Sequence, residues 1–252
     1  MSELYWLTDG QMERLRPFFP KSRGKPRVDD RRVLSGIIFI QRNGLMWKHA
    51  PAAYGPPKTL YNRWKRWSRM GVFATITTEL AAQAQETEIV MIDATHTKAH
   101  RTASSLGGSK GGRGRLIGRT KGGLNSKLHV LADAKGRPIR MFLSAGQTSD
   151  YIGARALLSS IPRAGSLLAD RGYDADCFRN ALIEMGISPC IPSRISRKVL
   201  IPHDADLYRQ RHRIENMFAR LKDWRRIATR YDRCLILFLS ACALAAIVIY
   251  WL

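Results

Sequence analysis

Apolar residues in the first 75 positions recur every three or four residues, the spacing of a helix with one buried face. Three segments show this pattern, at 7–19, 28–44 and 58–73. Thr8 precedes the first apolar residues, and Asp29 or Asp30 precedes those of the second segment, so these are expected N-caps. Asn43 and Gly44 are expected to end the second helix. The pattern predicts a small all-helical region at the N-terminus.

The third segment interleaves aromatic and basic residues. Tyr61, Trp64 and Trp67 fall along one stripe at helical spacing, with cations around them. One interpretation is an amphipathic helix with aromatic residues in the core and solvated cations. The other is the last helix of a helix-turn-helix that lies against DNA. On the second, the candidate DNA-binding residues are Tyr61, Arg63, Lys65 and Arg66.

Beyond residue 85 the pattern becomes that of strands. Residues 87–95 form a short apolar run, and 126–146 read as two strands around a turn at 133–136. Helices and strands then alternate, with helices at 151–162 and 175–186 and strands at 166–170 and 188–193. A hairpin followed by such alternation predicts an α/β fold, a mixed sheet flanked by helices.

A basic, glycine-rich stretch at 104–123 separates the first two of these strands. It is predicted to be a loop. It matches neither the phosphate-binding GxxxxGK[ST] pattern nor a strand–GxGxxG–helix unit, so no nucleotide cofactor is expected.

Charge narrows the class of partner. The net charge is +22 and the isoelectric point is near 10.6. Nucleic acid is the commonest polyanion to neutralise such a charge, and an anionic membrane surface is the alternative. Residues 234–252 carry no charge and are about long enough to span a bilayer. We favour a buried core helix there, because the segment contains Ser240 and several alanines and the chain has no second apolar span.

Cysteine and histidine spacing argues against a secreted protein and against a zinc site. The four cysteines form no CxxC pair, and the chain starts without a signal peptide, so we expect a reducing, cytoplasmic setting. His96 and His100 have a spacing that suits a metal, but no second ligand pair lies nearby, which disfavours zinc.

Two predicted strands end in a carboxylate, at Asp93 and at Asp170. A buried carboxylate is costly unless it is paired, hydrogen-bonded or metal-bound. Two on neighbouring strands would repel, and a divalent cation removes that penalty. An aspartate at a strand end more often caps a turn, and Asp174 is expected to cap the helix that begins near Ala175.

Residues 208–226 are predicted to form one basic helix. At about 100° per residue, Tyr208, Arg211, Glu215 and Lys222 share one narrow face. An adjoining apolar stripe would dock on the sheet; it consists of Ile214, Met217, Phe218, Leu221 and Trp224. Glu215 is therefore expected to meet the two strand-end aspartates.

The spacing Tyr208-x2-Arg211-x3-Glu215-x6-Lys222 resembles the Y-(2)-R-(3)-E-(6)-K signature of DDE transposases of bacterial insertion sequences. The segments MIDATHTKAH and LLADRGYDAD are similar to the two aspartate motifs of that group. The segments LTDGQMERLRPFFP, DDRRVLSGI and YGPPKTLYNRWKRW resemble the helical region of the insertion-sequence-five family.

The resemblance implies a ribonuclease-H-like catalytic domain at 85–252, preceded by a helix-turn-helix-like DNA-binding domain at 1–80. Asp93, Asp170 and Glu215 would be the catalytic acids. They would hold two divalent ions per active site, Mg²⁺ with Mn²⁺ as a substitute, for phosphoryl transfer. Hydrolysis at the ends of the element would free 3′-hydroxyls, which would attack target DNA.

By the same resemblance, Tyr208, Arg211 and Lys222 would hold DNA phosphates, and Arg171 and His96 would assist. The partners would be double-stranded DNA, both terminal inverted repeats and target, bound by a homodimer associated with the bacterial nucleoid. In this fold a late helix packs on the sheet, which disfavours a membrane span at 234–252. A non-catalytic DNA-binding regulator and a structure-specific nuclease on the same fold remain as alternative functions.

Overall fold

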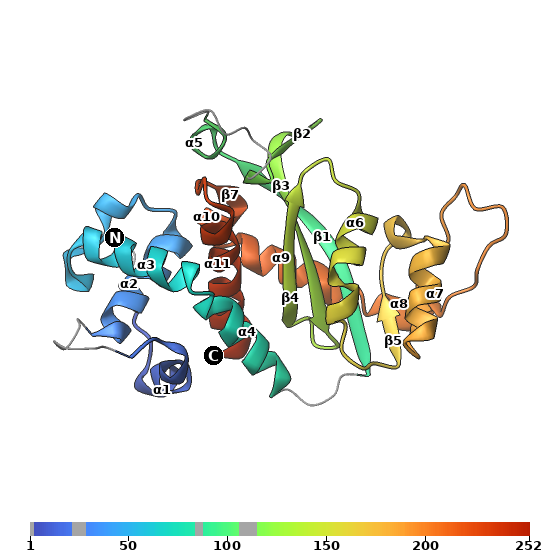
Figure 1. The fold of residues 1–252 in the computed structure, drawn as a ribbon, viewed down its shortest axis with the longest axis horizontal. Coiled ribbons are helices and arrows are strands. Elements are labelled where there is room, and N and C mark those ends of the chain that lie inside the picture. Colours follow the sequence, from blue (N-terminus) through green and yellow to red (C-terminus); the bar gives the residue numbers. More distant parts are fainter. Residues whose placement is uncertain (1–2, 22–28, 84–87, 106–114) are drawn as a thin grey trace.

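A computed structural model describes residues 3–21, 29–83, 88–105 and 115–252 (Figure 1). Part of the predicted glycine-rich loop at 104–123, residues 106–114, lies outside these ranges. In the described part, the loop prediction is wrong at Gly118–Thr120, which form a strand because they pair with the residues that follow the turn. The N-terminal region is helical, as predicted. Its elements are α1 (Asp9–Leu15), a 3-10 turn η1 (Arg16–Phe18), α2 (Asp30–Asn43), turns η2 (Trp47–His49) and η3 (Ala52–Tyr54), α3 (Pro57–Arg69) and α4 (Val72–Ala82).

The helix ends follow local chemistry. Thr8 and Gln11 form a capping box at the start of α1, and Asp29 caps α2. Gly44 ends α2 in the left-handed conformation, at φ 73°. The predicted helix at 58–73 is interrupted at Gly71, whose φ is also 73°, so that a separate helix, α4, begins at Val72.

Seven strands of the described chain form one mixed sheet, as predicted. They are β1 (Ile89–Ala99), β2 (Gly118–Thr120), β3 (Gly123–Asp133), β4 (Pro138–Ala145), β5 (Ser166–Leu168), β6 (Ser188–Cys190) and β7 (Thr229–Arg230). β1 pairs antiparallel with β3 and parallel with β5, in the order β2-β3-β1-β5-β6. β3 and β4 form the predicted hairpin, which Gly136 turns at φ 78°.

Helices cover both faces of the sheet. After the hairpin come α6 (Asp150–Leu157), turns η5 (Leu158–Ser160) and η6 (Arg171–Tyr173), α7 (Asp176–Glu184), α8 (Ala205–Arg209), α9 (His212–Lys222), α10 (Arg225–Ala228) and α11 (Leu235–Ala246). In Figure 1, α9 and α11 lie between the sheet and the N-terminal helices, whereas α6 and α7 lie on the other side. A short helix, α5 (Arg101–Ser104), follows β1.

Alternation along β1 assigns side chains to these two faces. Val90 and Ile92 pack in the core beneath α6 and α7, whereas Met91 packs in the larger core that includes α9 and α11. Asp93 and Thr95 are two and four residues after Met91, so their side chains point to the same face of the sheet as that of Met91. The two polar side chains therefore face α9.

The apolar C-terminal segment is a core helix, as favoured from the sequence. α11 packs against α2, α3, α4 and β4, and it continues as a π-helical turn over Ile247–Trp251. None of the helices in the described ranges is both long enough and apolar enough to cross a bilayer.

The prediction of one continuous helix over 208–226 is wrong. The chain forms α8, α9 and α10, with a turn at Gln210 and Arg211. There the amides of Gln210 and Arg211 bond to carbonyls three residues earlier, on Leu207 and Tyr208, which tightens the turn and breaks the helical register. Tyr208 thus does not share a single helical face with Glu215, although Arg211, Glu215 and Lys222 keep their spacing along α9.

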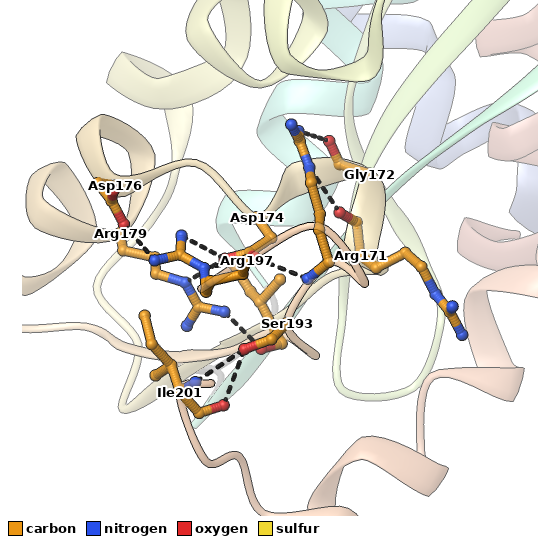
Figure 2. Close-up of polar contacts among 10 residues, drawn as sticks. Arg171, Gly172, Asp174, Asp176, Arg179, Ser193, Arg197 and Ile201 are labelled. Carbon is orange, nitrogen blue, oxygen red and sulfur yellow. Dashed lines mark hydrogen bonds and ion pairs between the residues drawn. The ribbon is translucent and has the colours of Figure 1, made fainter. Parts of the chain in front are cut away.

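The prediction that Asp174 caps α7 is also wrong, because Ala175 occupies that position without a side-chain cap. Asp174 is instead buried and accepts hydrogen bonds from Arg179, Arg197 and the backbone amide of Arg194 (Figure 2). Asp174 binds these donors and does not cap α7, because a carboxylate that is almost completely removed from water requires several charged or polar donors.

Candidate active site

Asp93 lies in the middle of β1, near the centre of the sheet. The prediction that a strand ends at this aspartate is wrong, because pairing with β3 extends β1 to Ala99. The side chain of Asp93 is 13% exposed, and its Oδ1 accepts a hydrogen bond from the amide of Ala94 at 2.8 Å. The remaining carboxylate oxygen, Oδ2, lies 2.6 Å from Nη2 of Arg211. The strand thus directs its carboxylate to the start of α9.

Arg211 connects this strand to Glu215. While Nη2 binds Asp93, Nη1 lies 2.6 Å from Oε1 of Glu215, one helical turn further along. Glu215 is 58% exposed. One guanidinium therefore brings together an acid from the central strand and an acid from a helix that lies far away in the sequence.

Asp170 follows β5, the parallel neighbour of β1. Its Oδ1 accepts a hydrogen bond from the amide of Gly172 at 2.8 Å and caps the turn η6. The parallel register pairs Met91 with Leu168, and Asp93 and Asp170 each lie two residues further along, close enough for the two charges to interact.

The electrostatics of Asp93 reflect these neighbours. The pKa of this carboxyl is raised from 3.8 to about 6, and burial is the largest cause. Arg211 and the Ala94 amide lower the pKa, whereas Asp170 and Asp150 raise it. The ionised carboxylate is therefore held at a cost. A divalent cation would offset that cost.

Lys222 and Tyr208 lie around the same acids. Lys222 Nζ donates to Thr95 Oγ1 at 2.6 Å, two residues beyond Asp93, and burial lowers the pKa of this lysine. Tyr208 is half-buried, and its pKa is raised by burial first and then by Asp170, Glu215 and Asp93, against the opposing effect of Arg211.

The two residues expected to assist have different positions. His96 belongs to the other alternating set of β1, is exposed, and contacts the carbonyl of Gly146 through Nε2 at 3.0 Å. Arg171 is exposed and directly follows Asp170, and its carbonyl accepts a hydrogen bond from Arg194.

The aromatic residues of α3 are divided between core and surface. Trp64 and Trp67 are fully buried, as the amphipathic interpretation expects, whereas Tyr61 is partly exposed and lies edge-on to Trp47. Arg63 forms an ion pair with Asp30 at 2.9 Å and stacks over Trp67. Lys65 is half-buried and Arg66 is exposed.

Sequence reasoning missed Lys127, Asp150 and Tyr173. Lys127 Nζ lies 3.1 Å from Oδ1 of Asp150, and the hydroxyl of Tyr173 is buried close enough to the acids for their charges to affect it. Ser149 and Asp150 look like an ordinary helix start in the sequence, and Lys127 stands inside a strand. Only the packing of α6 against β1, β3 and β4 brings them to the acids.

The donor chemistry fits a hard divalent cation, because every candidate ligand is a carboxylate oxygen. Within the described ranges, no three Asp, Glu, His or Cys side chains are already gathered as a metal cluster. Asp93 and Glu215 are held on Arg211 instead. These acids would bind a cation in exchange for that arginine.

Known proteins similar to this chain indicate its family. Residues 7–77 match the family model described as a putative transposase of the IS4/5 family, and residues 84–249 match the transposase DDE domain. A putative transposase for insertion sequence element IS6501 from Brucella ovis is 36% identical over 129 residues, which cover 50% of this chain and 98% of that protein. A putative transposase for IS402 from Burkholderia cepacia is 31% identical over 138 residues, which cover 47% of this chain and 63% of that protein.

Among solved structures, the piggyBac transposase in a synaptic complex with hairpin DNA has the same overall fold. The TM-score is 0.51 at 9% identity, covering 94% of this chain and 69% of that one. The fold therefore has the ribonuclease-H-like architecture of transposase cores, with a helical region before it. From the family match over most of its length, this chain belongs to the DDE transposases of the IS4/5 insertion-sequence family.

Proposed function

We propose that this transposase binds the terminal inverted repeats of its insertion sequence, hydrolyses the DNA to free 3′-hydroxyls and joins them to target DNA. The observation that carries the proposal is the bridge from Arg211 to both Asp93 and Glu215, with Asp170 on the adjacent parallel strand. These contacts support a site built from three acids of three separate segments, beside the middle of β1 and the end of β5.

Asp93, Asp170 and Glu215 are the ligands in this proposal, for two Mg²⁺ or Mn²⁺ ions per active site. When bound, such ions lower the pKa of the attacking water or 3′-hydroxyl and stabilise the leaving oxygen. The protein contributes the fixed carboxylates of the two strands. It also contributes Glu215 on the exposed side of α9, where it is accessible to metal and DNA.

Arg211 has a second role in this scheme. When Asp93 and Glu215 hold a cation, the Arg211 guanidinium would no longer be needed to neutralise them and would be free to contact a DNA phosphate beside the scissile bond. Lys222 and Tyr208, close to the same acids, hold the backbone on either side, and Arg171 and His96 extend these contacts. Phosphate contacts of this kind position DNA without selecting its sequence.

End recognition is assigned to residues 1–80, and catalysis to residues 85–252. On α3 the proposed contacts are Tyr61, Arg63, Lys65 and Arg66, and the net charge of +22 strengthens association with DNA. Because two ends must be joined in concert, the active form is proposed to be a homodimer on DNA.

The test uses Asp93→Asn, Asp170→Asn and Glu215→Gln, with Asp206→Asn as an exposed control. End binding is followed by gel shift, and cleavage and joining by gel assays in Mg²⁺ and Mn²⁺. Each site variant is expected to bind ends as the wild type does and to lose both reactions, whereas the control retains them. A site variant that joins strands at a near wild-type rate would disprove the assignment of the three acids.

Two other outcomes of these assays would contradict the proposed function and support an alternative one. DNA binding without any metal-dependent cleavage or joining would indicate a regulator. Cleavage without joining of pre-cleaved ends to target DNA would indicate a nuclease. Raising the salt concentration should weaken end binding steeply, because Lys and Arg contacts release counterions.

A further inference from the structure

Asp150, the first residue of α6, occupies a defined place beside the proposed metal site. Its side chain is 33% exposed, and Oδ1 is held by Nζ of Lys127, which also donates to the carbonyl of Thr148 at 2.7 Å. α6 is seated closely on β3. A Cβ atom at Gly153, one turn along, would lie 2.0 Å from Nδ1 of buried His129. The helix therefore fixes where Asp150 lies.

The second carboxylate oxygen of Asp150 converges with Asp170 on Gly172. At the position that a Cβ of Gly172 would occupy, Asp170 Oδ1 is 2.8 Å away and Asp150 Oδ2 is 3.4 Å away. A glycine leaves that position open between two carboxylate oxygens. Asp170 in turn lies two residues beyond the Met91–Leu168 pair of β1 and β5, as Asp93 does, which connects this position to Asp93.

Tyr173 supplies an independent observation that points to the same place. Its side chain is fully buried, and its hydroxyl has no hydrogen-bond partner. A buried hydroxyl is rarely left unpaired. Tyr173 directly follows Gly172, so this hydroxyl is available to donate to a carboxylate that shifts towards a cation or to a water in the site.

We propose that Asp150 is a fourth carboxylate of the divalent-metal site, positioned with Asp170 on either side of Gly172 and held by Lys127 until a cation competes for it. The inference rests on the proposed function, since it adds a ligand to the site that Asp93, Asp170 and Glu215 form there. The carboxylate ligands suit Mg²⁺ or Mn²⁺. Lys127 is a positioning residue that keeps Asp150 neutralised while no metal is bound.

Metal binding is measured on the full chain without DNA, by electron paramagnetic resonance of free Mn²⁺ during titration. Asp150→Asn is expected to weaken Mn²⁺ binding about tenfold, a size typical of residues that support a metal site. Lys127→Met is expected to strengthen binding, because it removes both a competing cation and a nearby positive charge. Asp9→Asn, an exposed acid paired with Arg31, is the matched control and should bind as the wild type does.

Asp93→Asn separates the two proposals. If Asp93→Asn loses tight binding while Asp150→Asn binds as the wild type does, the fourth-ligand inference is overturned and the proposed function stands. If Asp93→Asn itself binds as the wild type does, both are overturned. Weaker binding by Lys127→Met would overturn the competition between Lys127 and the metal.

Backbone cleavage gives a second readout that does not depend on affinity. Fe²⁺ substituted at the site, with ascorbate and peroxide, should cut the chain near residues 150 and 172 as well as near 93. Cuts near 93 and 215 without cuts near 150 would contradict the inference. If Asp150→Asn fails to fold because Lys127 is left unpaired, Lys127→Met/Asp150→Asn removes both charges. This double variant should fold and still bind Mn²⁺ more weakly than Lys127→Met alone.

Discussion

Nη2 of Arg211 lies 2.6 Å from Oδ2 of Asp93, although 118 positions separate the two residues. The same guanidinium reaches Glu215 through its other terminal nitrogen. A planar group with two separate donors is required for this, because the two acids come from a strand and a helix at different angles. Arg211 thus holds the proposed metal ligands in position before any ion or DNA binds.

Arg211→Lys should break this arrangement while keeping the positive charge. A lysine presents one nitrogen and cannot donate to both acids with the same geometry. We expect the metal-free protein to lose about 2 kcal/mol of unfolding free energy, the size of a hydrogen bond to a charged group. Urea unfolding in EDTA measures it.

The matched control is Arg209→Lys, at an exposed arginine that pairs with Asp206 on α8. Exposed ion pairs contribute at most about 1 kcal/mol, so this variant should remain close to the wild type. Equal stability of the two lysine variants would show that the bridge contributes nothing measurable.

The raised pKa of Asp93 predicts an unusual dependence of stability on pH. Its pKa in the folded chain is about 6, against 3.8 ordinarily, so between pH 4 and 6 the folded state holds a proton that the unfolded state has lost. The free energy of unfolding should therefore fall as the pH rises through this window. The decrease should be about 3 kcal/mol, at about 1.4 kcal/mol for each pH unit by which the pKa moves.

Buried His129 acts in the opposite direction. Burial lowers its pKa from 6.5 to about 4, so the unfolded state takes up a proton first as the pH falls, and stability is lost on acidification. The two effects oppose each other in the wild type. Comparison with Asp93→Asn isolates the effect of the carboxyl. In urea unfolding without metal, the unfolding free energy of the variant relative to the wild type should increase as the pH rises from 4 to 6. A difference that does not change with pH would contradict the prediction.

Asp174→Asn should be severely destabilising, even though Asp174 is not one of the proposed ligands. The carboxylate is 1% exposed and binds Arg179 and Arg197, at 2.8 Å each (Figure 2). Burial alone would raise the pKa of Asp174, but the donors from Arg197, the Arg194 amide and Arg179 hold it well below its usual range. Removing this charge leaves buried Arg179 without its counter-ion, at a cost of about 3–5 kcal/mol of unfolding free energy.

Asp176→Asn provides a control on the same arginine. Asp176 pairs with Arg197 at 2.7 Å but is 74% exposed, so its loss should cost no more than about 1 kcal/mol in urea unfolding. Similar losses in the two variants would mean that burial does not make the Asp174 contacts stronger.

The main elements of the fold were predictable because local patterns already select them. Thr8 caps α1, the turn near Gly136 joins two strands, and the uncharged segment after Cys234 needs a core to cover it. The errors occur where tertiary contacts override local preference. The tight turn before Arg211 breaks a helix that periodicity alone continues, and Asp174 is drawn into a buried ion-pair network instead of a cap.

The sequence by itself determined which candidate residues to consider: an aspartate in each of two apolar strand segments, a glutamate spaced from cations on a helix, and a charge suited to DNA. These depend on residue type and spacing along one element, which local geometry preserves. Only the tertiary structure decided that Arg211 bridges Asp93 and Glu215, and that Asp150 and Asp170 meet at Gly172. Such contacts join segments far apart in the chain. They form because α6 and α9 bury their apolar faces on opposite sides of the same sheet, and periodicity along one helix or strand contains no information about that packing.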